Sequence, residues 1–289
     1  MDLSSEDKSF LELYSDSIYE KPSLTVDSVI LRIFNEESTN YRKLSSKKLQ
    51  VFLLKRNWSP FVGYYALPGT FVDLNHELNE TMKMCVKNKV NLENFYYEQL
   101  FTFGDKSRDP RTRVLSVSYM LLTNQDSVLK NGEWFDIEVR KEKAIRIVNP
   151  DGYTQSQMVF VTLKNKTETI ENKLKISLKK ENLQETKSID IESSSLAFDH
   201  IKMIFFALER LKNKIEYTDI IFNLLPMAFT LTELKLSYEL VLDEKLLDAN
   251  FRRKTSKMVE ATNSFVTGKG HRSSQLFKLN PNWNSTNLD

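Results

Sequence analysis

Short runs of β-branched and aromatic residues recur through the first part of the chain. They occupy residues 25–34, 49–55, 97–103, 114–122 and 158–163. Runs of this length and composition are typical of strands that face a core. The first two are expected to be neighbours in one sheet, and an amphipathic segment from about His76 to Lys89 predicts a helix. This part of the chain is therefore predicted to be α+β with a mixed sheet.

A different pattern begins near Ser193. Apolar residues then recur at helical spacing and predict a long amphipathic helix; they are Leu196, Ile201, Ile204, Phe205, Leu208 and Leu211. We therefore divide the chain into two predicted domains, residues 1–192 and 193–289. The polar segment 164–192 before the boundary has alternating apolar residues at 174, 176 and 178. It is either an edge strand or a free linker, and the pattern leaves both open.

The last 60 or so residues carry start signals for two helices followed by two strand-like runs. Residues 230–233, Thr-Leu-Thr-Glu, form a capping box and predict a helix over 230–240. A short break follows, and Asp248 is the predicted N-cap of a second helix that runs to about residue 260. Runs at 263–267 and 275–279 flank two glycines and predict a hairpin. Helix, turn, helix and hairpin together predict a winged helix.

Composition narrows the class of protein. The chain of 289 residues is 40% hydrophobic, and no apolar run is long enough to cross a membrane. The first residues lack the basic and apolar regions of a secretory signal. The single cysteine, Cys85, excludes an intramolecular disulfide and a cysteine-based zinc cluster. A cytoplasmic location is expected, without a membrane contact, a cofactor or a metal ion.

The net charge is only +2, but basic residues are concentrated near the C-terminus. Asparagine suits adenine and arginine suits guanine in the major groove, while basic residues on a wing reach phosphate. The alternative is an ordinary solvated helix face. The predicted DNA-binding residues are Asn250, Arg252, Arg253, Lys254, Lys257, Lys269, His271 and Arg272.

The sequence ALPGTFVD at residues 66–73 resembles the entry to a Nudix box, and the predicted helix after it takes the place of the catalytic helix. Aligned without a gap, the functional positions of the Nudix consensus hold Thr70, His76, Met84, Cys85, Asn88, Lys89 and Asn91. A thiol, an amide and an ammonium group are poor ligands for Mg²⁺. Hence no catalytic residue is predicted. Lys89, with Lys83 or Lys87, is a candidate counter-charge for a bound diphosphate, or these lysines form a solvated face.

An arginine-rich stretch, residues 101–119, lies between two predicted strands. Guanidinium groups bind phosphates and carboxylates through paired hydrogen bonds, although a surface loop held by internal Arg–Asp pairs has the same composition. This stretch and residues 53–73 resemble the Nudix ADP-ribose pyrophosphatases and the Nudix-related regulators of NAD metabolism. The resemblance implies that these segments line a nucleotide pocket. The candidate ligand-binding residues are Arg56, Lys89, Asp105, Arg108, Asp109, Arg111 and Arg113.

The resemblance to the regulators continues at residues 196–200 (LAFDH), 216–226, 229–234 and 250–254. It implies a Nudix-type α/β/α sandwich followed by a C-terminal winged helix-turn-helix domain. We therefore expect a homodimeric transcriptional regulator that binds an approximately palindromic DNA operator and senses ADP-ribose or another phosphorylated metabolite. The alternatives are a divergent Nudix hydrolase and a DNA-binding protein that keeps the Nudix fold only for dimerisation.

Overall fold

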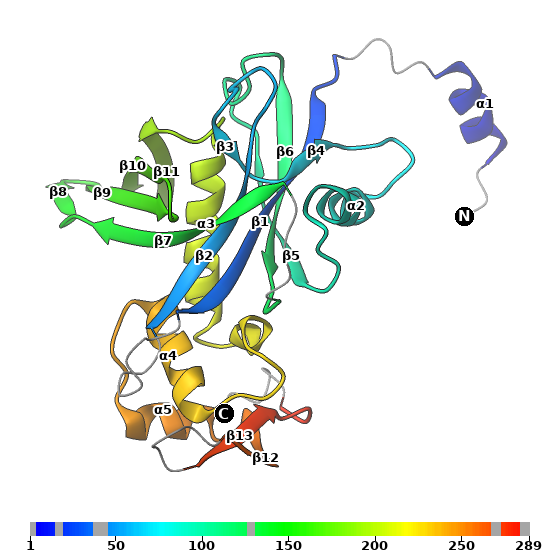
Figure 1. Ribbon diagram of the computed structural model, residues 1–289. Coiled ribbons are helices and arrows are strands. Elements are labelled where there is room, and N and C mark those ends of the chain that lie inside the picture. Colours follow the sequence, from blue (N-terminus) through cyan, green and yellow to red (C-terminus); the bar gives the residue numbers. More distant parts are fainter. Residues whose placement is uncertain (1–3, 15–19, 37–45, 126–130, 267–272, 284–289) are drawn as a thin grey trace.

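A large mixed sheet forms the centre of the computed structural model, which describes residues 4–14, 20–36, 46–125, 131–266 and 273–283. Its strand order is β11-β10-β9-β7-β2-β1-β6-β5, with three short strands at its sides (Figure 1). The strands are β1 (Ser23–Glu36), β2 (Ser46–Lys55), β3 (Tyr65–Ala66), β4 (Gly69–Phe71), β5 (Tyr96–Phe103), β6 (Val114–Leu122), β7 (Gly132–Lys141), β8 (Ile145–Asn149), β9 (Gly152–Lys164), β10 (Thr169–Glu181) and β11 (Gln184–Ser194). The five strands predicted from the sequence are all present.

The central strand β1 shows why both faces of the sheet are covered. It pairs antiparallel with β2 and parallel with β6, so its backbone is bonded on both sides. Its side chains alternate between two apolar clusters: Leu31 belongs to the larger cluster and Ile30 to the smaller one. A strand buried on both faces is continuously apolar, as residues 29–31 are.

One helix covers each face. α2 (Leu78–Val90) buries Met82 and Val86 in the smaller cluster, and α3 (His200–Lys214) buries Ile201 and Phe205 in the larger one. The helices lie on opposite sides of the sheet in Figure 1. This arrangement confirms the predicted α/β/α sandwich.

The polar segment before α3 is ordered strand rather than linker. It forms β10 and β11, which pair antiparallel at the edge of the sheet. The neighbouring strands β7 and β8 were not predicted, because polar residues interrupt β7 and β8 is exposed along its whole length. Figure 1 shows these strands projecting as an arm from the body of the sheet.

The C-terminal elements are α4 (Leu231–Leu242), α5 (Asp248–Thr255) and a hairpin of β12 (Val259–Val266) and β13 (Ser274–Leu279). The predicted capping box of α4 is confirmed, since the Thr230 hydroxyl accepts a hydrogen bond from the Glu233 amide at 3.1 Å. Two predictions for α5 were wrong. Leu247 is the N-cap, because the Asp248 carboxylate pairs with Lys235 instead. The helix also ends at Thr255, where the chain turns into β12.

The two parts of the chain share apolar packing. α3 contacts β5 and β11 on the sheet and α4 beyond it. A 3₁₀ helix, η2 (Ile220–Leu224), follows α3 and contacts β1. The boundary near Ser193 stays a prediction. A short helix, α1 (Ser5–Leu13), precedes the sheet. In the described part of the chain, no helix has the length and apolar character needed to span a membrane.

Candidate functional site

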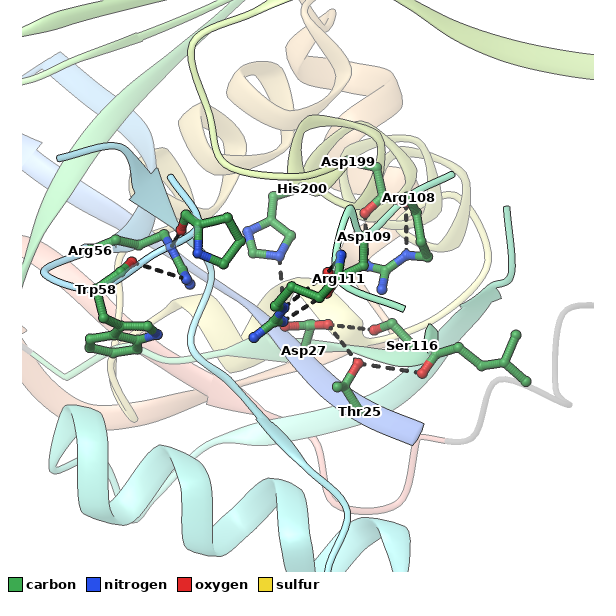
Figure 2. A network of polar contacts seen from close by, with 12 residues as sticks. Thr25, Asp27, Arg56, Trp58, Arg108, Asp109, Arg111, Ser116, Asp199 and His200 are labelled. Atoms are coloured by element: carbon green, nitrogen blue, oxygen red, sulfur yellow. Dashed lines mark hydrogen bonds and ion pairs between the residues drawn. The ribbon is translucent and has the colours of Figure 1, made fainter. Parts of the chain in front are cut away.

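A cavity of about 180 Å³ opens beside the start of β1. It is formed by β1, the loop after β2, the segment around β4, the end of α2, the loop between β5 and β6, and the residues before α3 (Figure 2). The residues that line it are Thr25, Asp27, Arg56, Trp58, Leu67, Gly69, Thr70, Phe71, Lys89, Arg108, Asp109, Arg111, Val114, Phe198 and His200. We call this cavity the pocket.

The carboxylate of Asp27 lies at the centre of the polar network in Figure 2. It is 7% exposed and accepts hydrogen bonds from the hydroxyls of Ser116 and Thr25. Gly69 packs directly against it: a Cβ at this position would lie 1.9 Å from Asp27 Oδ1. Any larger residue would therefore displace the carboxylate, so this glycine is required by its neighbour.

His200 connects the network to α3. Its Nδ1 accepts a hydrogen bond from the Leu67 backbone N–H at 3.0 Å, and its Nε2 lies 3.7 Å from Asp27 Oδ1. Burial lowers the pKa of His200, although the charges of Asp27 and Asp199 oppose this effect. The imidazole is therefore neutral at pH 7, with its proton on Nε2 facing the carboxylate.

Two arginines of the loop between β5 and β6 are already paired with carboxylates. Arg108 binds Asp199 through Nε at 3.1 Å and Nη2 at 2.8 Å, and both side chains are buried. Arg111 binds Asp109 through Nε at 3.0 Å and Nη2 at 2.7 Å. Burial works against ionisation of Asp109, but the hydrogen bonds from Arg111 outweigh it, so the pKa of this carboxyl is lowered. Arg–Asp pairs thus hold the loop, and its arginines still line the pocket.

Arg56 differs from these two arginines. Its Nε donates to the Pro60 carbonyl at 2.9 Å, and its guanidinium lies 5.2 Å from the Trp58 ring and 4.9 Å from the Phe198 ring. Burial, followed by the charge of Arg111, lowers its pKa. No carboxylate of the described residues forms an ion pair with it. The pocket therefore contains a partly desolvated cation that is bonded only to neutral carbonyls.

The lysines of α2 point to different places. Lys89 lines the pocket, and its Nζ donates to the Gly69 carbonyl at 2.5 Å. Lys83 lies over the Tyr97 ring at 4.7 Å, and Lys87 pairs with Glu93 at 2.9 Å on the surface. Of the three candidate counter-charges, the structure brings Lys89 to the pocket.

The positions of the altered Nudix box have ordinary structural roles. Cys85 is buried in the helix, and burial raises the pKa of its thiol to about 11. Glu77 and Glu80 form a capping box at the start of α2, as expected of acids at a helix N-terminus. His76 lies 3.7 Å from Asp73 before that helix. Within the described ranges, no group of three or more His, Cys, Asp or Glu side chains is placed to hold a metal ion.

The structure brings five of the seven predicted ligand-binding residues to the pocket, and it places two elsewhere. Asp105 accepts hydrogen bonds from Ser107 and lines a separate groove, while Arg113 is exposed. Among the other lining residues, the sequence did not indicate Asp27, Trp58, Phe198 or His200 as candidates for ligand binding. A signal for the last two was present in the LAFDH segment, which had been assigned to the winged helix.

The predicted DNA-binding residues lie mainly on the exposed face of α5. Phe251 and Thr255 anchor this helix in the core, whereas Asn250, Arg252 and Arg253 are exposed, as is Lys257 just beyond it. Lys254 is also exposed, but it pairs with Glu216 at 3.1 Å. Three predicted residues of the wing, Lys269, His271 and Arg272, lie outside the described residues.

Comparison with known proteins supports both halves of this description. Residues 221–279 match the family described as the NrtR DNA-binding winged helix domain. A transcriptional repressor of Acinetobacter baylyi, described as ADPR-responsive and named NtrR, is 29% identical over 95% of this chain and 89% of its own length. The crystal structure of Shewanella oneidensis NrtR with a 27mer DNA superimposes with a TM-score of 0.58 at 25% identity, covering 89% of this chain and 94% of that one. The chain combines a Nudix-like domain with an NrtR-type winged helix.

A second structure agrees on the fold of the Nudix-like domain and winged helix together. The MutT/nudix family protein of Enterococcus faecalis gives a TM-score of 0.67 and covers 96% of this chain and 94% of its own. At 24% identity this likeness concerns the fold alone. The predicted order, a Nudix-type sandwich followed by a winged helix, is therefore confirmed.

Proposed function

We propose that the chain is a metabolite-responsive transcriptional regulator whose Nudix-like domain senses a phosphorylated nucleotide and whose winged helix binds DNA. The proposal rests on the environment of Arg56 in the pocket, where this cation is partly buried and has no carboxylate of the described residues as an ion-pair partner. A partly buried cation whose hydrogen bonds within the described residues go to carbonyl oxygens is stabilised by an anion, and the guanidinium fork matches a phosphate. The neighbouring ammonium of Lys89 adds a second positive charge.

ADP-ribose is the effector that we propose. Its diphosphate carries the charge opposite to that of the two cations, Arg56 and Lys89, and the exposed Trp58 ring offers a surface for a base to stack on. The Asp27 carboxylate provides an acceptor for ribose hydroxyls. The relative from Acinetobacter baylyi is described as ADPR-responsive, which supports the same choice.

We further propose that the Nudix-like domain does not hydrolyse its ligand. In Nudix enzymes clustered carboxylates hold cations that activate water. Here the corresponding helix carries Cys85, Asn88 and Lys89. A lysine in place of a carboxylate favours binding of a phosphate over its cleavage. Incubation with ADP-ribose and Mg²⁺ or Mn²⁺ should release no AMP; steady release of AMP would favour the hydrolase alternative.

The DNA partner follows from the winged helix. We propose that the exposed residues of α5 meet base edges, and that the operator is an approximate palindrome read by a homodimer in the cytoplasm. We propose that exposed apolar residues on α1 and β8, such as Phe10, Leu11 and Ile147, contribute to the contact between the two protein chains. The division into residues 1–192 and 193–289 is part of the same proposal.

The deciding experiment measures ADP-ribose binding by isothermal titration calorimetry, once with Mg²⁺ and once with EDTA. We expect binding in both buffers. Arg56→Ala should weaken it by about 10- to 150-fold, since one hydrogen bond to a charged group contributes about 1.5–3 kcal/mol. Arg140→Ala is the matched control, because Arg140 also stacks on a ring, Phe160 at 3.9 Å, but lies outside the pocket. Absence of binding to the wild-type protein would favour the alternative in which the Nudix fold serves only for dimerisation.

A further inference from the structure

Residues 196–200 join β11 to α3, and we call this segment the linker. Most of its residues contact residues that line the pocket or lie beside it. Leu196 forms a bridge with Tyr65, and the Ala197 amide donates to the Tyr65 carbonyl at 2.9 Å. Asp199 holds Arg108, and His200 accepts from Leu67 (Figure 2). The linker is thus part of the pocket wall and also the start of α3.

Phe198, in the middle of the linker, has an unusual backbone. Its φ is +54°, a left-handed conformation that costs energy for a bulky residue and persists only where the surroundings impose it. Its ring lies 4.9 Å from the Arg56 guanidinium, 5.7 Å from that of Arg111 and 4.8 Å from the Phe61 ring. Because both cations face the pocket, an anion bound there acts directly on the partners of this strained residue.

The far end of α3 reaches the winged helix. The helix has 15 residues and is therefore about 22 Å long. Leu211 and Ile215, in and just after its last turn, share an apolar cluster with Leu234 and Val241 of α4. A groove of about 490 Å³ lies between α3, the sheet and α4. Close packing resists movement, so α4 is less firmly held against α3 along this groove than at the shared cluster.

From these contacts we propose that the linker transmits occupancy of the pocket to the winged helix, with Phe198 and His200 as the positioning residues. The inference rests on the proposed function and adds to it the residues that couple its two sites. An anion bound at Arg56, beside Arg111, changes the contacts that hold Phe198 in its left-handed conformation. A change at Phe198 alters the start of α3, and the rigid helix carries it to α4. Coupling of this kind requires that the two arrangements differ in affinity for the effector.

The test compares two phenylalanines that share the same environment. Phe61 also has a left-handed backbone, with φ +65°, and its ring contacts that of Phe198, but it belongs to the loop after β2 and does not lead into a helix. Phe198→Gly and Phe61→Gly both remove a ring and both suit the backbone, since glycine accepts positive φ. Any loss that comes merely from a damaged aromatic cluster should therefore appear in both variants.

The measurement is fluorescence anisotropy with a DNA duplex that the wild-type protein has selected from a random pool. The coupling ratio is the Kd for DNA with saturating ADP-ribose divided by the Kd without it. For the wild type we expect a change of about 5- to 150-fold, the usual range for allosteric coupling. Phe198→Gly should bring the ratio to within about twofold of one while still binding DNA. Phe61→Gly should keep the wild-type ratio even if it binds ADP-ribose more weakly.

His200 supplies a second, independent test. Asparagine places an amide oxygen near the position of Nδ1 and keeps the acceptor for the Leu67 amide, whereas alanine removes it. We expect the coupling ratio to survive in His200→Asn and to fall in His200→Ala. The reverse ratio, the Kd for ADP-ribose with and without DNA, must change by the same factor, because coupling is reciprocal.

The possible outcomes separate this inference from the proposed function. A wild-type protein that binds ADP-ribose and DNA with coupling, together with an unchanged ratio in Phe198→Gly, overturns the inference and leaves the function intact. Equal loss of coupling in Phe61→Gly and Phe198→Gly also overturns it, since the linker then has no special role. A wild-type protein whose DNA affinity does not respond to ADP-ribose overturns the proposed function itself, and the inference with it.

Discussion

Replacement of Asp199 by asparagine should destabilise the folded protein strongly. The Asp199 carboxylate and the Arg108 guanidinium are 9% and 4% exposed and are joined by two hydrogen bonds. Removing one partner of a buried pair leaves the other charge uncompensated and costs about 3–5 kcal/mol. Asp109 also interacts with Arg108, so we expect the lower end, about 3 kcal/mol. At about 2–4 °C per kcal/mol, the melting temperature should fall by about 6–12 °C.

Urea unfolding followed by circular dichroism measures the free energy of unfolding, and two further variants test the reasoning. Glu209→Gln breaks the Lys141–Glu209 pair, which has a similar distance of 2.9 Å but is about one-third exposed, and should cost under about 1 kcal/mol. Arg108→Met combined with Asp199→Asn removes both charges of the pair and should recover much of the loss. The reasoning is refuted if Asp199→Asn costs no more than Glu209→Gln, or if the double variant is less stable than the single one.

Three other predictions concern pH and DNA. Burial raises the pKa of Glu98, but the hydrogen bonds from Lys214, Tyr96 and Arg210 and the charge of Lys214 together outweigh it. The pKa of Glu98 therefore lies below its ordinary value of 4.5. The ionised Glu98 carboxylate therefore contributes its full stabilisation above about pH 5, and this contribution is lost as the pH falls through the lowered pKa. The difference in melting temperature between wild type and Glu98→Gln should accordingly shrink below pH 4.5. Arg253→Ala should weaken binding of the selected duplex by about 1–3 kcal/mol in anisotropy titrations and leave random DNA nearly unaffected. Lys257→Ala should weaken binding of the selected and the random duplex equally, and it should lower the slope of log K against log salt concentration by about one. The same slope in wild type and variant would exclude a phosphate contact by Lys257.

The parts of the fold that the sequence predicted correctly are those with strong local signals. β6 is a short run of mainly apolar and aromatic residues, and the capping box at Thr230 defines the start of α4. The position of Asp248 could not be read in this way, because a residue from another helix, Lys235, takes its carboxylate. Local patterns identify elements, whereas the partner of a given side chain depends on the tertiary structure.

The pocket illustrates the same limit more fully. The arginine-rich loop indicated it, because guanidinium groups bind phosphates and because the stretch resembles the segment that lines a nucleotide pocket in Nudix proteins. Its other wall was missed, since the Leu67–His200 contact joins residues 133 positions apart and the Arg108–Asp199 pair joins residues 91 apart. The sequence showed Asp199 and His200 as neighbours, and adjacent residues at the start of a helix point in different directions. Both in fact contact the pocket wall, through different partners.

The linker has two physical roles that can be separated by experiment. The Arg108–Asp199 pair is buried and joined by two hydrogen bonds, so it stabilises one arrangement of the pocket whether or not a ligand is present. Phe198 is strained and faces cations that an anion would engage, so its energy depends on the ligand. Loss of the pair should therefore lower stability with or without ADP-ribose, whereas loss of the ring should lower the response to ADP-ribose more than it lowers stability. In the proposed coupling the two properties act together, because the energy of Phe198 changes with the ligand and the neighbouring pair holds the start of α3 in place.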